Sequence, residues 1–475
     1  MRGAGAVSLG LVMRPVLTPE QMGAVDAAAP EPTEVLIDRA GAAVARQAVA
    51  MLGGTYGRRV VVVAGKGNNG NDGREAARRL RRRGVQVLEV DGLGAPERLP
   101  ASDLVIDAAY GTGFRGEYRP PDPAGAPVLA VDIPSGVDGL TGAVAGGAVR
   151  ADRTVTFAAL KPGLLFHPGR ELAGTVVIAD IGLDVSDVAA AVGLVEAVDV
   201  ARWLPPRPAD SHKWRAALVI AAGSPGMTGA AHLAARAAQR AGAGMVRVAS
   251  PGLEHDPALP TEAVGIAVPA AGWDARLLAE LERAGALVVG PGLGRGAATG
   301  AAVHHVVATA PVPLLIDGDG LSAFEGRADV VGSRDAPTIL TPHDGEFARL
   351  AGHVPGADRI GAARGLARDT GAIVLLKGPT TVIAHPDGRA HLSTSGDARL
   401  ATAGTGDVLS GIVGALLAQG VEALEAASAG AWLHGRAAEQ GPPRGLVASD
   451  VAEGLPAALA GLDADGGAGH DGGAG

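Results

Sequence analysis

Short runs of β-branched and other apolar residues alternate along the chain with longer stretches in which Ala, Arg and Leu recur at helical spacing. This rhythm is typical of parallel β-sheets with helices on both faces. In the first part of the chain it predicts strands at 59–64, 85–90, 103–107, 128–133, 154–158 and 175–180. A second series predicts strands at 217–222, 245–249, 286–289, 313–317, 337–340 and 372–377. The pattern therefore predicts an α/β protein with two sheets.

The division between the two series lies at LPPRPADSHK, residues 204–213, where three prolines interrupt the helical pattern. A chain of 475 residues also exceeds what one hydrophobic core normally supports. We therefore expect two domains, 14–202 and 203–462. The segment DADGGAGHDGGAG is of low complexity, so 463–475 is predicted to be a disordered tail.

Composition narrows the classes of function. The net charge of −9 and the aromatic share of 3% disfavour nucleic-acid binding, which needs cations at phosphates and rings that stack on bases. The cationic run RRLRRR at 78–83 is then interpreted as a solvated helix face. The absence of cysteine excludes disulfides, thiolate metal sites and cysteine nucleophiles. No charge-free apolar run reaches the roughly 18 residues of a membrane span.

The N-terminal apolar patch AVSLGLVM follows one positive residue, Arg2, and precedes no convincing cleavage site. It is therefore not interpreted as a signal peptide, and a cytoplasmic protein is expected. Met13 is an alternative to Met1 as the first residue.

Three predicted strands of the first series end in polar residues. The first is followed by GKGNNGNDG, which has the Gly65-x-Gly67-x-x-Gly70 spacing of a dinucleotide-binding loop. The others end at Asp107 and at Asp132. Because ligands bind outside the carboxyl ends of parallel strands, these residues are expected to share one site. The glycines would let backbone N–H groups approach a pyrophosphate, with a helix beginning near Asn71.

The polar residues of these strand ends suggest two kinds of chemistry. Asn69, Asp107 and Ser135 offer one carboxylate and neutral oxygens. That set is thin for Mg2+ and suits a weakly held monovalent cation better. Asp132 is then free to act on a ligand as an acid or a base.

The segments VLTPEQMGAVDAAA, GNNGNDG, DAAYGTGFRGE and VDIPSGVDGLTG, in this order and spacing, resemble the NAD(P)H-hydrate epimerase domain, which is Rossmann-like. The resemblance implies a dinucleotide hydrated at the nicotinamide C6, and potassium (K+) at Asn69, Asp107 and Ser135. The family usually has glycine where Asn71 stands, so a changed loop contact is expected. The hydrate would be held by Asn68, Asn69, Gly70, Asn71, Asp72, Gly111, Thr112, Gly113, Phe114, Arg115, Gly116, Glu117 and Asp132.

The second series of strands carries its own candidate site at AGTGDVLSG, residues 403–411. A glycine turn that opens a helix lets backbone N–H groups converge on developing negative charge. Asp407 lies in the first helical turn, where the helix dipole would stabilise its charge, and could accept a proton from a hydroxyl that is being phosphorylated. Lys377 follows a strand and could neutralise a phosphate. The chain has no P-loop motif.

The GTGD motif alone resembles the ribokinase-like fold. Together with HK at 212–213, AAGSPGMTGAAHLAARAAQRAGAGMV, GPGLG and LTPHDGEFARL, it resembles the ADP-dependent NAD(P)H-hydrate dehydratase. A departure is HKWRAALVI, where the family commonly has glycines after the lysine. The resemblance implies hydrate contacts from Ala230, Gly294, His343 and Asp407. It implies nucleotide contacts from Lys377, Gly378, Pro379, Thr380, Thr381, Gly404, Thr405 and Gly406.

The two resemblances converge on one metabolite. They imply that the first domain epimerises the R and S hydrates NADHX and NADPHX, and that the second dehydrates the S form with ADP and Mg2+, giving AMP and phosphate. A homo-oligomer is expected. One alternative is a ribokinase-like vitamin or sugar kinase with an accessory Rossmann-like domain, and another is an RNA-associated scaffold. For His343, a turn histidine with local hydrogen bonds is also an open alternative.

Overall fold

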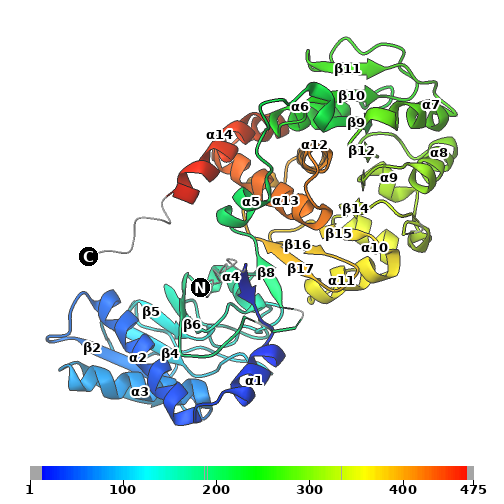
Figure 1. The fold of residues 1–475 in the computed structure, drawn as a ribbon. Coiled ribbons are helices and arrows are strands. Elements are labelled where there is room, and N and C mark those ends of the chain that lie inside the picture. The colour runs from blue at the N-terminus through cyan, green and yellow to red at the C-terminus, as the bar shows by residue number, and fades with distance from the viewer. Residues whose placement is uncertain (1–12, 187, 190, 333, 468–475) are drawn as a thin grey trace, which may run out of the picture. The chain divides into compact units, whose positions relative to one another are not determined.

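The computed structural model describes residues 13–467, apart from 187, 190 and 333, and forms two compact units that divide between Val192 and Gly193 (Figure 1). Residues 6–12 of the N-terminal apolar patch and residues 468–475 of the predicted tail lie outside the described residues. In the described part of the chain, no helix is both long enough and apolar enough to cross a membrane.

The first unit contains a six-stranded parallel sheet in the order β3-β2-β4-β5-β6-β7. Its strands are β2 (Arg59–Ala64), β3 (Gln86–Asp91), β4 (Leu104–Ala108), β5 (Val128–Val131), β6 (Arg153–Phe157) and β7 (Thr175–Ala179). Its helices are α1 (Pro19–Ala28), α2 (Thr33–Leu52), α3 (Asn68–Arg82) and α4 (Gly169–Leu172). A short strand, β1 (Arg14–Val16), reaches Leu160 through a bridge at Val16.

The two faces of this first sheet are covered differently. Val60 and Val62 of β2 lie in a core with α2 and α3, whereas Val61 and Val63 lie in a second core with loop residues. The expectation of helices on both faces is therefore wrong for this unit. The connections that follow β3 and β4 are rich in Gly and Pro, which disfavour helices, so extended loops cover the second face.

The second unit is built on nine strands in the order β17-β16-β15-β14-β13-β12-β9-β10-β11. They are β9 (Ala217–Ala221), β10 (Met245–Ala249), β11 (Ala263–Ile266), β12 (Ala286–Val289), β13 (Leu314–Ile316), β14 (Thr338–Leu340), β15 (Ile373–Leu376), β16 (Thr381–Ala384) and β17 (Ala390–Ser393). All pair in parallel except β16 and β17, which pair antiparallel with their neighbours. The strand β8 (Val192–Leu194) begins at the division between the units.

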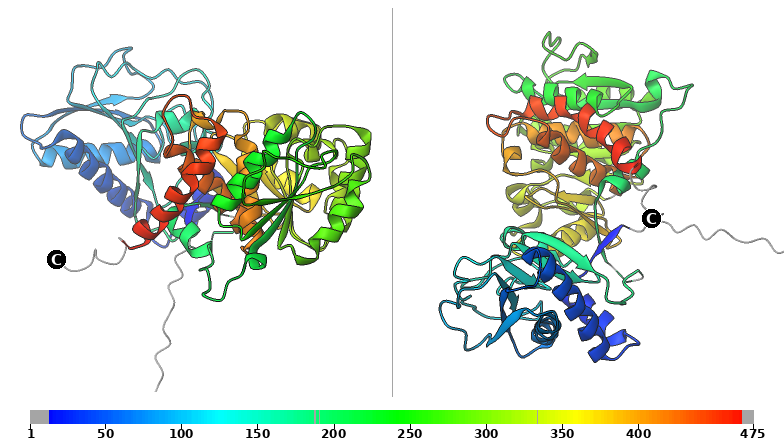
Figure 2. Two further views of the ribbon diagram at one scale, coloured as in Figure 1. Left: turned by 90° about the horizontal axis from the view of Figure 1, so that it is seen from above. Right: turned by 90° about the vertical axis from the view of Figure 1, so that its left-hand side faces the viewer.

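Helices lie on both faces of this second sheet, as predicted (Figures 1 and 2). One layer contains α6 (Thr228–Arg240), α12 (Thr405–Ala418), α13 (Ala423–Glu439) and α14 (Ala448–Gly467). The other contains α7 (Trp273–Ala279), α8 (Ala297–Thr309), α9 (Asp319–Ser322), α10 (Asp344–Ala351) and α11 (Arg359–Thr370).

The helix α12 packs unusually closely, because two of its contact positions are glycines. A Cβ at Gly411 would lie 2.2 Å from the carbonyl oxygen of Ala234 in α6, and a Cβ at Gly414 would lie 2.5 Å from the side chain of Val288 in β12. Any larger residue would push the helix away from the sheet. The close packing fixes the start of α12, where the GTGD motif lies.

Two predicted boundaries differ from the observed structure. The helix α5 (Ala197–Trp203) precedes the Pro-rich segment but packs on α13 and α14, with Val200 fully buried. The division at Val192 is therefore earlier than the predicted one at 202, since the prolines end a helix within the second unit. At the other end, α14 continues to Gly467, into the segment for which composition predicted a tail.

A pair of fragments tests the place of α5. A fragment that begins at Gly193 retains α5, whereas one that begins at Leu204 exposes the surfaces of α13 and α14 that α5 covers. Because full burial of one Val contributes about 1.5–3 kcal/mol, the shorter fragment should lose at least about 2 kcal/mol of unfolding free energy. Urea denaturation of both fragments measures this difference, and coincident curves would show that α5 does not belong to the second unit.

Candidate functional site

The first site lies where the strand order of the first unit reverses, between β2 and β4. Loops on either side of such a reversal diverge and leave a crevice. Here a cavity of about 720 Å³ opens between them. Of the residues predicted to hold the hydrate, its wall includes Asn68, Asn69, Asp72, Gly111, Thr112, Gly113, Phe114 and Asp132. Gly70, Asn71, Arg115, Gly116 and Glu117 are not part of this wall.

The glycines of the GKGNNGNDG loop serve different purposes. A Cβ at Gly65 would lie 1.9 Å from the carbonyl oxygen of Ala109, and one at Gly70 would lie 1.9 Å from that of Gly65. These two glycines are therefore required by packing at the start of α3. Gly67 is the N-cap of α3 and has open space around its Cα. The helix begins at Asn68, earlier than predicted, so Asn68 and Asn69 belong to its first turn.

Asn71 stands where the family usually has glycine, and its side chain forms a hydrogen bond within α3. Its Oδ1 accepts a hydrogen bond from Arg74 Nη1 at 3.4 Å. The expected change in loop contact is therefore a bond along α3.

The three residues predicted to bind potassium lie around the ends of β4 and β5. The buried carboxylate of Asp107 accepts hydrogen bonds from Ser135 Oγ at 2.7 Å and from Ser135 N at 2.8 Å. Burial raises the pKa of Asp107 to about 6, against the lowering effect of these hydrogen bonds. The amide oxygen and nitrogen of Asn69 are buried without a hydrogen-bond partner in the structure. A monovalent cation could be bound by Asn69 Oδ1 and by the carboxylate of Asp107, so these oxygens fit the ion.

Lys161 is a site residue that the sequence analysis missed. Its buried ammonium lies 2.6 Å from Asp132 Oδ1 and donates to Thr156 Oγ1 at 2.9 Å. Asp132 has a φ of 65°, a strained conformation that orients its carboxylate at the end of β5. The only sequence signal was a lysine three residues after the predicted strand 154–158, in ALKPG.

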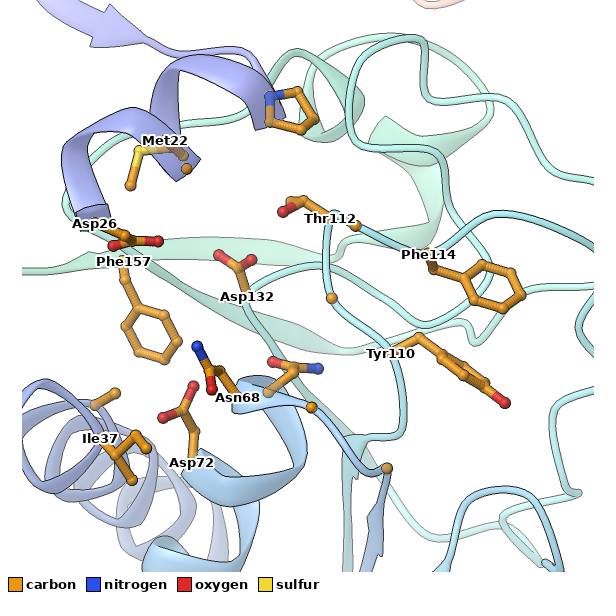
Figure 3. A pocket seen from close by; sticks show the side chains of 18 of the residues that line it. Met22, Asp26, Ile37, Asn68, Asp72, Tyr110, Thr112, Phe114, Asp132 and Phe157 are labelled. Carbon is orange, nitrogen blue, oxygen red and sulfur yellow. The ribbon is translucent and has the colours of Figure 1, made fainter. Parts of the chain in front are cut away.

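Two further carboxyl groups face this cavity with Asp132 (Figure 3). Burial raises the pKa of Asp72 to about 8, and the charges of Asp132 and Asp26 add to the effect. Burial likewise raises the pKa of Asp26, a residue of α1 that the sequence analysis did not identify. At neutral pH Asp72 therefore carries its proton, beside a carboxylate paired with Lys161.

The second site also lies at a reversal of strand order, between β9 and β12. A Cβ at Gly292 would lie 2.9 Å from the Cβ of Ala230 at the start of α6, so these loops pack closely. The backbone N of Gly294 donates to Asp319 Oδ2 at 2.9 Å. The structure thus brings Ala230 close to the loop of Gly294, whereas their predicted contact with the hydrate stays a prediction.

Lys377 is already paired in the structure. Its ammonium lies 2.9 Å from Asp317 Oδ1 and 3.4 Å from Glu346 Oε2. It also lies near the GTGD motif, because a Cβ at Gly406 would be 3.6 Å from Lys377 Nζ. Asp317 was missed by the sequence analysis, although it ends a predicted strand. The turn Lys377–Thr381 joins β15 to β16.

Asp407 occupies the first turn of α12, as predicted, but its charge is not stabilised there. Burial raises its pKa to about 7, and the nearby carboxylate of Asp317 adds to the effect more than Lys377 offsets it. Burial and the charge of Asp317 therefore outweigh the stabilisation of the Asp407 carboxylate that the helix dipole predicted. The hydroxyl of Thr405 donates to the carbonyl of Leu400 at 2.8 Å or of Thr402 at 2.9 Å, so it shapes the loop.

His343 caps α10. Its Nδ1 accepts hydrogen bonds from the backbone N of Gly345 at 3.0 Å and of Glu346 at 3.3 Å. Since Nδ1 is an acceptor, Nε2 is the ring nitrogen that carries a proton, and it lies 3.6 Å from Glu346 Oε1. The turn-histidine alternative thus describes the local contacts of His343.

Models of two known families match the two units. The family model of NAD(P)H-hydrate dehydratase matches residues 218–454, and that of the YjeF-related protein N-terminus matches 33–100 and 89–163. The bifunctional NAD(P)H-hydrate repair enzyme Nnr of Mycobacterium tuberculosis is 44% identical, over 81% of this chain and 84% of that protein. The chain belongs to the bifunctional NAD(P)H-hydrate repair enzymes. The same enzyme of Escherichia coli is 36% identical, over 83% and 84% of the two chains.

Solved structures agree with the family of the second unit. The ADP/ATP-dependent NAD(P)H-hydrate dehydratase of Bacillus subtilis, co-crystallised with ATP and Mg2+, is 32% identical with a TM-score of 0.50, over 57% of this chain and 99% of that chain. A ribokinase-like protein of Enterococcus faecalis, 24% identical with a TM-score of 0.51, covers 57% and 95% and supports the fold. The predicted fold class and NAD(P)H-hydrate repair function are therefore confirmed, and the kinase and RNA-scaffold alternatives are not supported.

The capping role of His343 in this NAD(P)H-hydrate repair enzyme can be tested by two substitutions. His343→Ala removes the acceptor for the first N–H groups of α10 and should lower the unfolding free energy by about 1 kcal/mol. His343→Asn supplies a good N-cap and should lose much less. Denaturant unfolding of the two variants measures the difference, and equal losses would argue against the cap.

Proposed function

We propose that the first unit interconverts the R and S forms of NAD(P)H hydrate, and that the second dehydrates the S form with ADP. The observation that carries the second assignment is the position of Asp407. Its pKa of about 7 lies close to neutrality, as suits a general base, in a turn that also presents the backbone of Gly404–Gly406. The name of the Bacillus subtilis relative supports a nucleoside diphosphate or triphosphate as the donor.

The chemistry requires a phosphoryl donor because hydroxide is a poor leaving group from C6 at neutral pH. Asp407 would take the proton of the C6 hydroxyl as that oxygen attacks the β-phosphorus of ADP, and AMP would leave. The amides of Gly404–Gly406 would stabilise the transferring phosphoryl group. The ring nitrogen would then expel phosphate from C6, and loss of the C5 proton would restore the dihydronicotinamide.

Mg2+ in this scheme would be held chiefly by the nucleotide. Among the described residues, no group of three or more His, Asp or Glu side chains could hold a metal ion. Mg2+ commonly binds through substrate phosphates and a few protein oxygens, so the residues present fit this arrangement. Lys377 would contribute a cation shared with Asp317 and Glu346.

The first unit offers an acid and a base on one cavity, which is what epimerisation at C6 needs. Asp72, with its raised pKa, would protonate the C6 hydroxyl, which leaves as water while the ring nitrogen forms an iminium. Asp132, held by Lys161, would accept a proton from the water that adds to the other face of C6. One inversion thus moves a proton from Asp72 to Asp132, and its return to Asp72 through solvent, or a reaction in the reverse direction, restores the site.

We also propose that K+ binds at Asn69, Asp107 and Ser135. The support is the buried amide of Asn69 without partners and the buried carboxylate of Asp107. An ion there would neutralise Asp107 and tie the start of α3 to the ends of β4 and β5. The cytoplasmic location and homo-oligomeric state expected from the sequence remain predictions.

Asp107→Ala tests the ion and the division of labour together. Full-length wild-type enzyme with ADP and K+ should convert an equal R and S mixture completely to NAD(P)H, measured by recovery of the near-UV absorbance of the nicotinamide. Asp107→Ala removes the charged ligand, so half of the mixture should recover rapidly and the rest only at the spontaneous rate. Replacing K+ by a bulky organic cation should have the same effect on wild type.

The pure S epimer provides the control, because its dehydration should be unchanged in Asp107→Ala. An unchanged rate of epimerisation in this variant would place the ion elsewhere. No recovery of either epimer by wild type would overturn the proposed function itself.

Asp407→Asn tests the general base. The substitution keeps the size and the helix position, so folding should change by less than about 1 kcal/mol. Turnover of the S epimer with ADP should fall by about 10²–10⁴-fold, because the proton acceptor is lost. In wild type, turnover should rise with pH through about 7, where Asp407 loses its proton, and then level off. A variant that keeps more than about a tenth of the turnover would place the base elsewhere.

A further inference from the structure

Asp317 joins three separate parts of the second site through one buried carboxylate. It follows β13 and is 3% exposed. Its Oδ1 accepts hydrogen bonds from Lys377 Nζ at 2.9 Å and from Thr341 Oγ1 at 2.8 Å. Its Oδ2 accepts one from Ser410 Oγ at 2.8 Å. These donors come from the end of β15, the end of β14 and the helix α12.

Two of these donors belong to the proposed phosphoryl-transfer machinery or stand directly beside it. Lys377 begins the turn proposed to hold the nucleotide. Ser410 lies one helical turn after Gly406, and its Oγ is also 3.1 Å from the Gly406 carbonyl. A Cβ at Gly406 would lie 3.8 Å from Asp317 Oδ2 and 3.6 Å from Lys377 Nζ. The ammonium and the GTGD turn therefore meet at the same carboxylate.

The charge on Asp317 is maintained by its partners. Burial alone would raise its pKa, but the charge of Lys377 and the three hydrogen bonds hold the pKa below its ordinary value. The same pairing keeps the pKa of Lys377 above its ordinary value, although burial would lower it. Both shifts favour the charged forms, and removing one partner would leave the other charge buried.

We propose that Asp317 is a positioning residue for the dehydration: its carboxylate fixes the ammonium of Lys377 and the first turns of α12, and so determines where the phosphoryl group meets Asp407. The inference rests on the ADP-dependent dehydration proposed above. Lys377, Thr341 and Ser410 donate to the two carboxylate oxygens of Asp317, so its proposed role is to act through Lys377 and Ser410.

The same carboxylate influences Asp407 electrostatically. After burial, the charge of Asp317 is the largest cause of the raised pKa of Asp407. Removing that charge should therefore lower the pKa of Asp407 and move the acidic limb of the pH–turnover profile to lower pH. The charged or titratable groups around Asp407 from the neighbouring elements are Asp317, Asp319, Glu346, Lys377 and, through the backbone of Thr405, His434.

Asp317→Asn in the full-length enzyme is the direct test, with the pure S epimer and ADP as substrates. The amide keeps the volume but not the charge. We expect kcat to fall by about 10–100-fold, as for a small misplacement of reacting groups, and the midpoint of the pH–kcat profile to move to lower pH. Epimerisation by the first unit, measured in the same preparation, should be unchanged and reports an intact chain.

Ser410→Ala is the matched variant, because it removes the link to α12 without changing any charge. Its kcat should fall while the pH midpoint stays at the wild-type value. A wild-type kcat together with a wild-type pH midpoint in Asp317→Asn would overturn the proposal. Equal losses of kcat in both variants without any shift of the midpoint would also overturn it, because they would indicate only a structural role.

Two controls separate the possible failures. If near-UV circular dichroism shows that Asp317→Asn does not fold, Ser410→Ala decides, and wild-type kcat in that variant overturns the proposal. If wild-type enzyme does not dehydrate the S epimer with ADP, the proposed function fails independently of Asp317.

Discussion

Each unit of the protein buries a carboxylate at the end of a central parallel strand, and each site is organised by the need to compensate that charge. Asp107 follows this rule in the first unit and Asp317 in the second, and both are almost inaccessible to solvent. An isolated carboxylate in such a position would be strongly destabilising. The groups that stabilise each carboxylate must therefore lie at these strand ends, which is where the proposed reactions take place.

The two carboxylates are compensated in different ways, and their pKa values show it. Lys377 and two hydroxyl groups surround Asp317, and its pKa is lowered. Asp107 has only Ser135 and a backbone N–H, and burial raises its pKa to about 6. The first unit is thus short of one positive charge at the place where Asn69 also lacks partners. A bound cation is the simplest addition that corrects both, which explains why an ion is proposed for one unit and a lysine suffices in the other.

The reacting groups proposed for the two units follow the same electrostatic logic. In the first cavity, Lys161 pairs with Asp132, while burial and the charges of Asp132 and Asp26 raise the pKa of Asp72. In the second site, Lys377 pairs with Asp317, and the pKa of Asp407 is raised to about 7. In both sites a lysine pairs with one carboxylate, and the neighbouring carboxyl group has a raised pKa.

The sequence by itself determined the parallel strands of both series except β11, because apolar runs buried on both faces have a local signature, whereas the middle of this edge strand is exposed. It also determined the motif residues at the strand ends, since GNNGNDG and GTGD are contiguous in the chain. The sequence analysis did not identify β16 and β17, although HPDGR between them is a hairpin turn signal, because each strand is only four residues long. Nor did it identify Lys161 or Asp317, which are single residues in otherwise apolar context. Their importance comes from contacts between residues that are separated in the sequence. Lys377 contacts Asp317, and Lys161 contacts Asp132, only once the strands are aligned in the sheet. Protonation was likewise decided by the tertiary structure, because burial and neighbouring charge reversed the effect that the helix dipole predicted for Asp407.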